Sequence, residues 1–502
     1  MIIPTNQPST TVDKSPDWAL LKQFITVLAL LLITISCGAQ AQTVTLVDAN
    51  RLFDMAEKLE PGLFFPPSLT QRIIEADNEW YLRVYDGSRT MAAVNINGTG
   101  PFFTGDVYVL GGAFGESPVY INKLVPLLAD LERVQVPVSK TLELPATPFD
   151  YATLNLPAHF VNNIPGQNLP TSINGTDNTP ADNPVTNNGA TLGRVLFYDT
   201  ELSANGTISC ASCHQQDKGF SDDAVLSTGF LGGKTARHSM TLINARFYQR
   251  GRFFWDERAA TLEEQVLMPF QDPVEMGMTL ESLVSRVSAQ PFYAALFEKA
   301  FGSPVINSDR IAKALAQFVR SIVSYSSKYD AGRAVSPTPM ANFSNFSAQE
   351  NLGKNLFFRN IPSGGGGCFG CHTTEAFIGA NPGPQNNGLD AVSMTDLGAG
   401  AVFSDPRFVG RFKTSSLRNV ELTAPYMHDG RFATLEEVVE HYNSGIQKHP
   451  TLDAALKDNN GNPVRLNLTE TEKAALVAFL KTLTDPSVAT EEKWSNPFRT
   501  LQ

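Results

Sequence analysis

Beyond residue 190, apolar residues recur at helical spacing, and several of these stretches open with a capping signal. Leu476, Phe479, Leu480 and Leu483 follow the i, i+3, i+4, i+7 pattern of a helix with one face toward a core. In four places a Ser or Thr precedes a Glu by three residues, as in a capping box: Thr261 and Glu264, Ser347 and Glu350, Thr434 and Glu437, Thr469 and Glu472. This part of the chain is predicted to be mainly α, with long loops between the helices.

The preceding region has a different pattern. Apolar residues between Leu46 and Ala56 keep helical spacing, whereas residues 80–85 and 106–110 alternate or are rich in β-formers, with turn signals at Asp86-Gly87 and Asn97-Gly98. We therefore predict a small α+β accessory domain over residues 42–160. Its single histidine, His159, is expected at the surface rather than as a ligand.

Residues 161–189 are rich in Asn, Pro, Thr and Gly, which predicts a linker or a long surface loop. After it, the pattern L-G-basic-x-L-F occurs at residues 192–197 and again at residues 352–357. Such a repeat indicates one unit used twice. The repeat thus predicts two tandem domains, residues 190–345 and 346–487, followed by a tail over residues 488–502.

Composition and charge narrow the class of partner. The chain has 502 residues, of which 42% are hydrophobic and 18% charged, and its formal net charge is −11. Such an acidic chain is not expected to bind nucleic acid or an anionic membrane surface. An apolar run from Phe24 to Ile35 is short for a membrane span and is followed by Ala39-Gln40-Ala41, so residues 1–41 are predicted to be a signal peptide. Cys37 offers an alternative lipid-anchor site, and either reading places the protein in the periplasm.

Two pentapeptides carry the clearest chemistry. Cys210-Ala-Ser-Cys213-His214 and Cys368-Phe-Gly-Cys371-His372 both read C-x-x-C-H, the attachment signal of c-type haem. Two thiols bind the porphyrin and the adjoining histidine ligates the iron. A redox C-x-x-C pair or a zinc site is the alternative, but a zinc site would group its four ligands more closely. The motifs therefore predict two covalently bound haems, one in each tandem domain. The predicted fold is thus mainly α, with two tandem cytochrome-c-like domains after the small α+β accessory domain.

The stretches around these motifs resemble the bacterial di-haem cytochrome c peroxidases and their MauG-type relatives. The resemblance covers residues 190–485 and rests on residues 206–214, 254–258, 262–277, 417–420 and 423–430. In that family the first haem is the peroxidatic one, and a loop histidine caps its iron in the resting peroxidases. Phe230 stands where that histidine would be, so the resemblance implies an open iron with His214 as its protein ligand. His238 is the alternative cap.

The resemblance also implies roles for residues near the first haem. Glu275 would move a proton between the two oxygens of peroxide, with Gln265 and Pro269 lining the distal pocket. Judged by residue type alone, Glu275 would be a surface carboxylate. Trp255 resembles the tryptophan that carries electrons between the haems, although it is also typical of a core aromatic residue.

At the second haem, His372 would be the proximal ligand. Tyr442 occupies the place of the methionine that is the sixth ligand in the peroxidases, and a phenolate there would stabilise ferric iron. A buried core tyrosine is the alternative. The resemblance further implies a calcium ion held partly by the carbonyls of Thr423 and Pro425, with Asn244 as a possible side-chain ligand.

These features predict an exported di-haem oxidoreductase that uses hydrogen peroxide, with a small c-type cytochrome or a cupredoxin supplying electrons at the second haem. One alternative is a MauG-type oxidase of a protein or organic substrate that works through high-valent di-haem iron. Tyr442 favours this alternative, whereas Gly366 replaces the tryptophan through which MauG reaches its protein substrate. A non-enzymatic di-haem electron carrier is a third possibility, and Phe230 argues against it because carriers close both axial sites.

Overall fold

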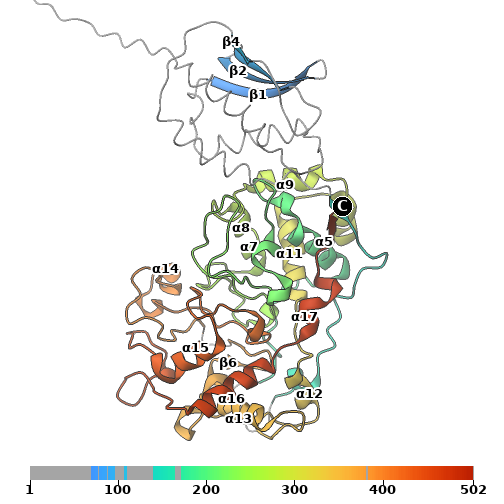
Figure 1. Ribbon diagram of the computed structural model, residues 1–502. Coiled ribbons are helices and arrows are strands. Elements are labelled where there is room, and N and C mark those ends of the chain that lie inside the picture. The colour runs from blue at the N-terminus through green and yellow to red at the C-terminus, as the bar shows by residue number, and fades with distance from the viewer. Residues whose placement is uncertain are drawn as a thin grey trace, which may run out of the picture. The chain divides into compact units, whose positions relative to one another are not determined.

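The computed structural model describes residues 69–76, 79–86, 89–96, 107–109, 140–163, 171–379 and 383–500. The chain forms two compact units, Met1–Val138 and Ser139–Gln502 (Figure 1). The predicted signal peptide and the predicted helix around residues 46–56 lie outside the described residues.

The first unit contains a four-stranded antiparallel sheet in the order β1-β2-β3-β4. Its strands are β1 (Leu69–Ala76), β2 (Glu79–Asp86), β3 (Arg89–Ile96) and β4 (Val107–Val109). Asp86 at the end of β2 pairs with Arg89 at the start of β3, so the two strands are antiparallel neighbours on either side of the predicted turn signal. The two predicted strands are confirmed as β2 and β4, while β1 and β3 were not predicted.

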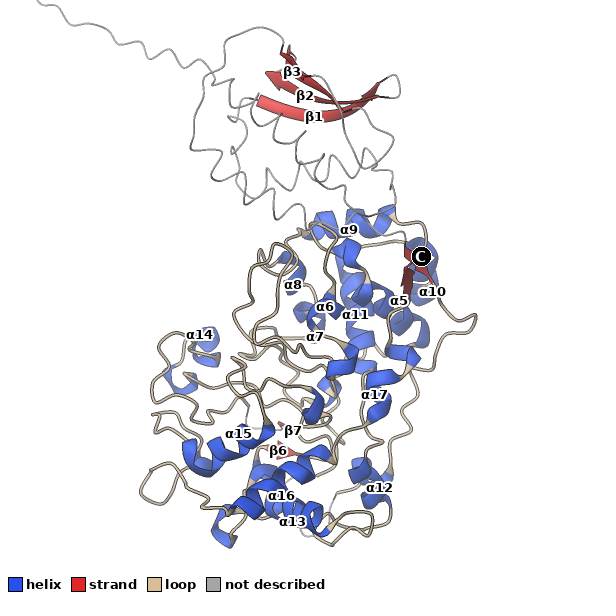
Figure 2. Cartoon of the chain, in the orientation of Figure 1, coloured by secondary structure: helices blue, strands red, loops and turns tan. Residues whose placement is uncertain are grey.

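The second unit is mainly helical, as predicted (Figure 2). Its α-helices are α4 (Ala158–Val161), α5 (Asn187–Tyr198), α6 (Cys210–Cys213), α7 (Leu262–Gln265), α8 (Met268–Gln271), α9 (Leu280–Ala289), α10 (Tyr293–Phe301), α11 (Ser308–Ser321), α12 (Lys328–Ala334), α13 (Ala348–Phe358), α14 (Ala399–Phe403), α15 (Leu435–Glu440), α16 (Glu470–Lys481) and α17 (Pro486–Thr490). Its short strands are β5 (Lys140–Leu142), β6 (His372–Thr373), β7 (Ile378–Gly379) and β8 (Phe498–Thr500). In the described part of the chain, no helix has both the length and the apolarity needed to cross a membrane.

The repeated L-G-basic-x-L-F pattern marks two equivalent helix crossings. Gly193 of α5 packs on α11, and a Cβ there would lie 2.0 Å from the carbonyl oxygen of Ala314. Gly353 of α13 packs on α16 in the same way, with a Cβ position 1.8 Å from the carbonyl oxygen of Ala475. Only glycine permits backbones to approach this closely. Each crossing lies in its own hydrophobic core, one for each half of the unit.

Three of the four predicted capping boxes form completely, at the starts of α13, α15 and α16. At α7, the Thr261 hydroxyl accepts a hydrogen bond from the Glu264 amide, but the Glu264 carboxylate accepts one from the Ala260 amide instead. The local pattern therefore located the helix starts correctly and missed this one detail.

The boundaries between the predicted segments differ from those observed. The start of the second unit at residue 139 assigns residues 140–160 to it, and β5 pairs with β8 from the chain's end. The tail also packs inward, since Trp494 is buried and donates from Nε1 to the Ser321 hydroxyl of α11. The expected linker is partly interior: Ile173 and Asn183 are buried, and Asn183 donates to Glu263. A segment whose polar residues form buried hydrogen bonds has the same composition as an exposed loop. Composition therefore could not distinguish a partly buried segment from a linker.

The expectation that His159 lies at the surface is wrong. Its side chain is buried, and its Nε2 lies 2.9 Å from a carboxylate oxygen of Asp330. Asp330 also pairs with Arg418 at 2.6 Å, so the histidine contacts a buried ion pair. Its partner is 171 residues away in the chain, which is why local sequence carried no sign of the contact.

Candidate functional site

Cys210 and Cys213 lie on α6, one turn of helix capped by Ser209 and Ser212. His214 follows directly, and its Nδ1 lies 3.0 Å from the carbonyl oxygen of Phe220. A hydrogen bond to that carbonyl places the proton on Nδ1 and leaves Nε2 with its lone pair, as a metal-ligating histidine requires. Burial lowers the pKa of His214, which keeps the ring neutral at pH 7.

The second motif repeats this arrangement. Cys368 begins the 3-10 turn η5 (Cys368–Gly370), and His372 lies on β6 with its Nδ1 3.4 Å from the carbonyl oxygen of Phe377. Burial lowers the pKa of His372 to about 4, so this imidazole is neutral as well. Both histidines are thus held in the tautomer that offers Nε2 to an iron.

The four motif cysteines are unpaired, and burial raises their pKa values to about 12 for Cys210 and Cys368 and about 11 for Cys213 and Cys371. Redox-active C-x-x-C pairs instead have a lowered thiol pKa. Within the ranges described above, no three His, Cys, Asp or Glu side chains gather as a metal cluster would require. The donor set therefore fits covalent haem at each motif better than a redox pair or a zinc site.

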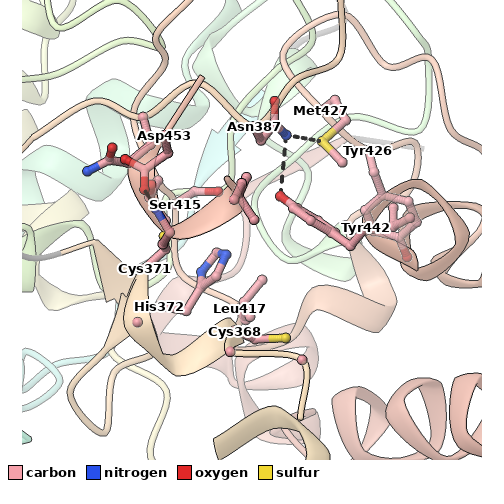
Figure 3. Close-up of a pocket in the computed structure, with 18 of the residues that line it drawn as sticks. Cys368, Cys371, His372, Asn387, Ser415, Leu417, Tyr426, Met427, Tyr442 and Asp453 are labelled. Carbon is pink, nitrogen blue, oxygen red and sulfur yellow. Dashed lines mark hydrogen bonds between the residues drawn. The ribbon is translucent and has the colours of Figure 1, made fainter. Parts of the chain in front are cut away.

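The second motif opens into a cavity of about 770 Å³, a size typical of ligand and cofactor pockets. Cys368, Cys371, His372 and Tyr442 line it, and Trp255 reaches it from the first half of the unit. Figure 3 shows the cysteines and His372 on one side, with Asn387, Met427 and the Tyr442 ring on the other. Tyr442 therefore lies across the cavity from the motif that would hold a haem.

Tyr442 lies in an unusual helical turn. The predicted capping box of Thr434 and Glu437 opens α15, and a π-helical turn, η8 (His441–Gly445), follows this helix directly. Such π turns are frequent at functional sites because they redirect a side chain. The Tyr442 hydroxyl is 3.3 Å from Asn387 Nδ2, and burial raises the pKa of Tyr442 to about 12. A phenolate here would need a cation such as iron to stabilise it.

Trp255 is fixed at the wall of this cavity. Its Nε1 donates to the carbonyl oxygen of His238 (2.7 Å), and its own carbonyl accepts from the Lys413 amide (2.7 Å). Its ring makes an edge contact with His428, at 6.5 Å between centroids. Both readings of Trp255 are compatible with this position, since it packs against neighbours and also faces the second site.

Glu275 lies on a tight turn between α8 and α9. Its amide donates to the Asp272 carboxylate (3.1 Å), and the next amide, of Met276, donates to the Pro269 carbonyl (3.2 Å). Burial, followed by the charge of Asp272, raises the pKa of Glu275 to about 7, against the opposing charge of Arg258. The carboxylate in turn raises the pKa of both Cys210 and Cys213, so it lies within electrostatic reach of the first motif.

The other residues predicted around the first motif take the following positions. Gln265 ends α7, and Pro269 lies in the first turn of α8, where its carbonyl anchors the Glu275 turn. Phe230 donates from its amide to the Glu275 carbonyl (3.0 Å), and its ring packs so closely on Gly277 that a Cβ there would lie 2.4 Å from it. The loop that carries Phe230 is therefore joined to the loop that carries Glu275.

His238 is held in place on both sides of its ring. Its Nε2 lies 3.2 Å from the Ser221 hydroxyl, and its Nδ1 lies 3.1 Å from the carbonyl oxygen of Ala224. Its amide donates to the carbonyl of His428 (2.8 Å). A histidine in this network would have to give up these bonds to approach an iron.

The residues proposed for calcium lie in two places. Thr423 and Pro425 line the cavity of the second motif. Asn244 is fully buried, and its carboxamide oxygen accepts from the Ser324 amide (3.0 Å). As an ion ligand, Asn244 would have to share or exchange that hydrogen bond.

Sequence reasoning missed Asn387, Met427 and Phe412 as parts of the site. Met427 lies within residues 423–430, one of the stretches that carry the family resemblance, and this was the only signal in the sequence for its place in the cavity. Phe412 stacks on His428 at 3.7 Å between ring centroids. Neither Phe412 nor Asn387 belongs to a recognisable motif, and only the folded chain brings them to the cavity.

Comparison with known proteins agrees with this geometry. The family model described as di-haem cytochrome c peroxidase matches residues 187–334. The methylamine utilization protein MauG of Methylorubrum extorquens is 36% identical over 308 residues, which cover 61% of this chain and 80% of that protein. The cytochrome c551 peroxidase of Nitrosomonas europaea is 34% identical over 300 residues, covering 59% and 79%.

Among solved structures, a MauG-like protein associated with microbial copper homeostasis is similar, with a TM-score of 0.57 and 31% identity. The match covers 69% of this chain and 99% of that one. A di-haem peroxidase of Burkholderia thailandensis shares the fold, with a TM-score of 0.52 and 24% identity. The chain belongs to the di-haem cytochrome c peroxidase and MauG family, and is an oxidoreductase with two covalently bound c-type haems.

Proposed function

We propose that the protein is an exported peroxidase that reduces hydrogen peroxide at the His214 site and receives electrons through the His372 site. Reduction of one peroxide to two waters consumes two electrons and two protons. The haems, when bound, supply the iron and carry the electrons. The side chains of this chain would supply the acid/base chemistry and the route between the two sites.

The observation that carries this proposal is the position and pKa of Glu275. A proton that moves from the inner to the outer oxygen of peroxide needs a group that accepts and releases it near neutral pH. The pKa of Glu275, raised to about 7, matches that task, and its carboxylate lies within electrostatic reach of Cys210 and Cys213. The backbone amides of Glu275 and Met276 donate hydrogen bonds to the Asp272 carboxylate and the Pro269 carbonyl. A fixed backbone therefore holds the Glu275 carboxylate in place.

Trp255 supports the proposed electron route. It comes from the first half of the unit, yet it lines the cavity that contains His372 and Tyr442. A small c-type cytochrome or a cupredoxin would deliver electrons to the second haem, and Trp255 would relay them to the first.

A second candidate function is the oxidation of a protein or organic substrate, as in the MauG relatives. The observation that favours it is Tyr442, whose oxygen faces the second cavity in place of a thioether. A hard phenolate ligand stabilises the higher oxidation states of iron. Gly366 argues against the specific partner of MauG, because it provides no aromatic side chain before the second motif.

Electron paramagnetic resonance of the diferric holoprotein, before and after one equivalent of peroxide, tests both candidates. A high-spin signal beside a low-spin signal is expected, because Phe230 cannot ligate the first iron. If added ferrocytochrome restores the ferric signals rapidly after peroxide, the peroxidase proposal is supported. Slow recovery that ferrocytochrome does not accelerate favours the oxidase. Two low-spin signals that peroxide leaves unchanged would contradict both candidates.

We also propose a structural calcium ion at the carbonyls of Thr423 and Pro425, and export to the periplasm. Metal analysis of the dialysed holoprotein, and of protein treated with a chelator, tests the calcium ion. Amino-terminal sequencing of the secreted protein tests export, because cleavage after Ala41 would leave Gln42 first. A lipid-modified Cys37 would instead support the anchored form.

A further inference from the structure

The segment 385–388, here called the Asn387 strap, lines the second cavity with Gln385, Asn386 and Asn387 and is fixed along its length. Gln385 exchanges two backbone hydrogen bonds with Phe412, at 2.8 and 2.9 Å. The carbonyl oxygen of Asn387 lies 3.0 Å from the ring nitrogen Nε2 of His441, the residue before Tyr442. The Gly388 carbonyl accepts from the Gln447 amide (2.8 Å). The strap thus holds the Asn387 side chain in one position relative to the π turn.

Asn386 adds to this rigidity. Its side-chain oxygen accepts from the Gly388 amide (2.8 Å), and its Nδ2 lies 3.0 Å from His449 Nδ1 and 2.9 Å from the Thr451 hydroxyl. Gly388 adopts a φ of 71°, and a Cβ there would lie 2.6 Å from Ile446. The turn after Asn387 therefore requires glycine, and its shape is set by the segment that follows Tyr442.

The orientation of the Asn387 carboxamide follows from its partners. One edge of the amide lies 3.5 Å from Met427 Sδ and 3.3 Å from the Tyr442 oxygen (Figure 3). A thioether sulfur has no proton and only accepts, so the group facing it must be the NH₂. The same NH₂ faces Tyr442, and an NH₂ only donates. Tyr442 therefore accepts a hydrogen bond from Asn387, an arrangement that suits an anionic oxygen.

From this geometry we infer that Asn387 is a positioning residue that orients the Tyr442 oxygen toward the second haem iron and tunes the strength of that ligand. The inference rests on the proposed role of Tyr442 as an iron ligand. A hydrogen bond to a ligand oxygen withdraws electron density from it and weakens its preference for ferric iron. The sulfur of Met427 accepts a hydrogen bond from the second N–H of the same NH₂, which fixes the rotation of the amide.

Removing the donor should lower the reduction potential of the second haem. In Asn387→Leu the phenolate keeps its full electron density and binds ferric iron more strongly relative to ferrous iron. A tenfold change in that ratio corresponds to about 59 mV for a one-electron couple. We expect a decrease of at least that size for the second haem, with the first haem unchanged.

The experiment is a spectroscopic redox titration of the holoprotein and four variants: Asn387→Leu, Asn387→Gln, Met427→Leu and Tyr442→Phe. Asn387→Gln retains an NH₂ donor and should recover part of the shift, which a purely structural role of the strap would not predict. Met427→Leu is the matched control, because it removes the other partner of the amide and leaves the donor to Tyr442. Its shift should be smaller than that of Asn387→Leu.

Failure of this inference can be separated from failure of the ligand assignment. If Tyr442→Phe changes the absorption and potential of the second haem while Asn387→Leu does not, Tyr442 is the ligand and the role of Asn387 is refuted. If Tyr442→Phe leaves the second haem unchanged, the ligand assignment is refuted and this inference with it. Equal shifts in Asn387→Leu and Asn387→Gln would also refute it, because the donor would then be irrelevant.

Discussion

Replacing Glu275 by glutamine should make the protein more stable at alkaline pH while it abolishes most of its peroxide chemistry. The folded protein holds the pKa of Glu275 at about 7, whereas the ordinary value is 4.5. Because the folded-state pKa is raised, the neutral carboxyl favours folding below pH 4.5, and this advantage is lost as pH rises through 7. At 1.36 kcal/mol per pKa unit, the ionised carboxylate costs about 3 kcal/mol above pH 7. This is an upper limit, because the side chain keeps some contact with solvent.

The assay is denaturant unfolding of wild-type and Glu275→Gln holoprotein at several pH values between 4 and 8.5. The carboxamide of the variant stays neutral, so the two proteins should be equally stable near pH 4. The variant should gain stability relative to the wild type by about 1.4 kcal/mol per pH unit above pH 4.5, and the gain should level off above pH 7. Glu298→Gln, at an exposed position of α10, is the matched control and should show no such trend.

The same variant tests the chemistry. Loss of a general acid/base group typically lowers the rate by about 10² to 10⁴. If ionised Glu275 accepts the first proton, the wild-type rate should fall about tenfold per pH unit below 7, and the variant should lose this dependence. A stability difference that does not change with pH would refute the raised pKa. A variant that keeps both its rate and the wild-type pH profile would refute the proton-transfer role.

Two further predictions concern the scaffold. Gly353→Ala places a Cβ 1.8 Å from the Ala475 carbonyl oxygen and should lower the free energy of unfolding by about 1 to 3 kcal/mol. Denaturant unfolding should show a lower midpoint. An unchanged midpoint would show that α13 and α16 move apart at no cost in stability. Arg418→Leu removes the buried partner of Asp330 (2.6 Å) and should cost about 3 to 5 kcal/mol at pH 7, measured by thermal or denaturant unfolding. A loss below about 1 kcal/mol would refute this expectation and mean that the hydrogen bonds from His159 and Ser327 are enough to satisfy the Asp330 carboxylate.

The features that could be predicted from sequence are those set by local or repeated patterns. Ser347 and Thr469 located helix starts because a capping box is complete within four residues. The L-G-basic-x-L-F repeat located both helix crossings, because the glycine marks a close backbone contact in each. The haem motifs are equally local, and their histidine tautomers follow from carbonyls five or six residues further along the chain.

The features that could not be predicted depend on contacts between distant segments. His159 is buried by an acid 171 residues away, and Asn387 meets Tyr442 across 55 residues. The π turn at His441–Gly445 also escaped prediction, because Leu435, Val438, Val439 and Tyr442 keep the i, i+3, i+4, i+7 spacing of an ordinary α-helix. In each case a polar group takes its role from a partner that only the tertiary fold provides.

Buried polar contacts join the two halves of the second unit, which is one compact unit. Trp255 donates to the carbonyl of His238, and the His238 amide donates to the carbonyl of His428, so three residues from both halves form one chain of hydrogen bonds. Ser324 joins Asn244 to Asn419 in the same manner. Leaving such a buried group unpaired costs about 1 to 3 kcal/mol, so sliding one half against the other would break several bonds at once. The proposed path from the second site through Trp255 to the first would therefore have a fixed length, and electron transfer along it would require no domain movement.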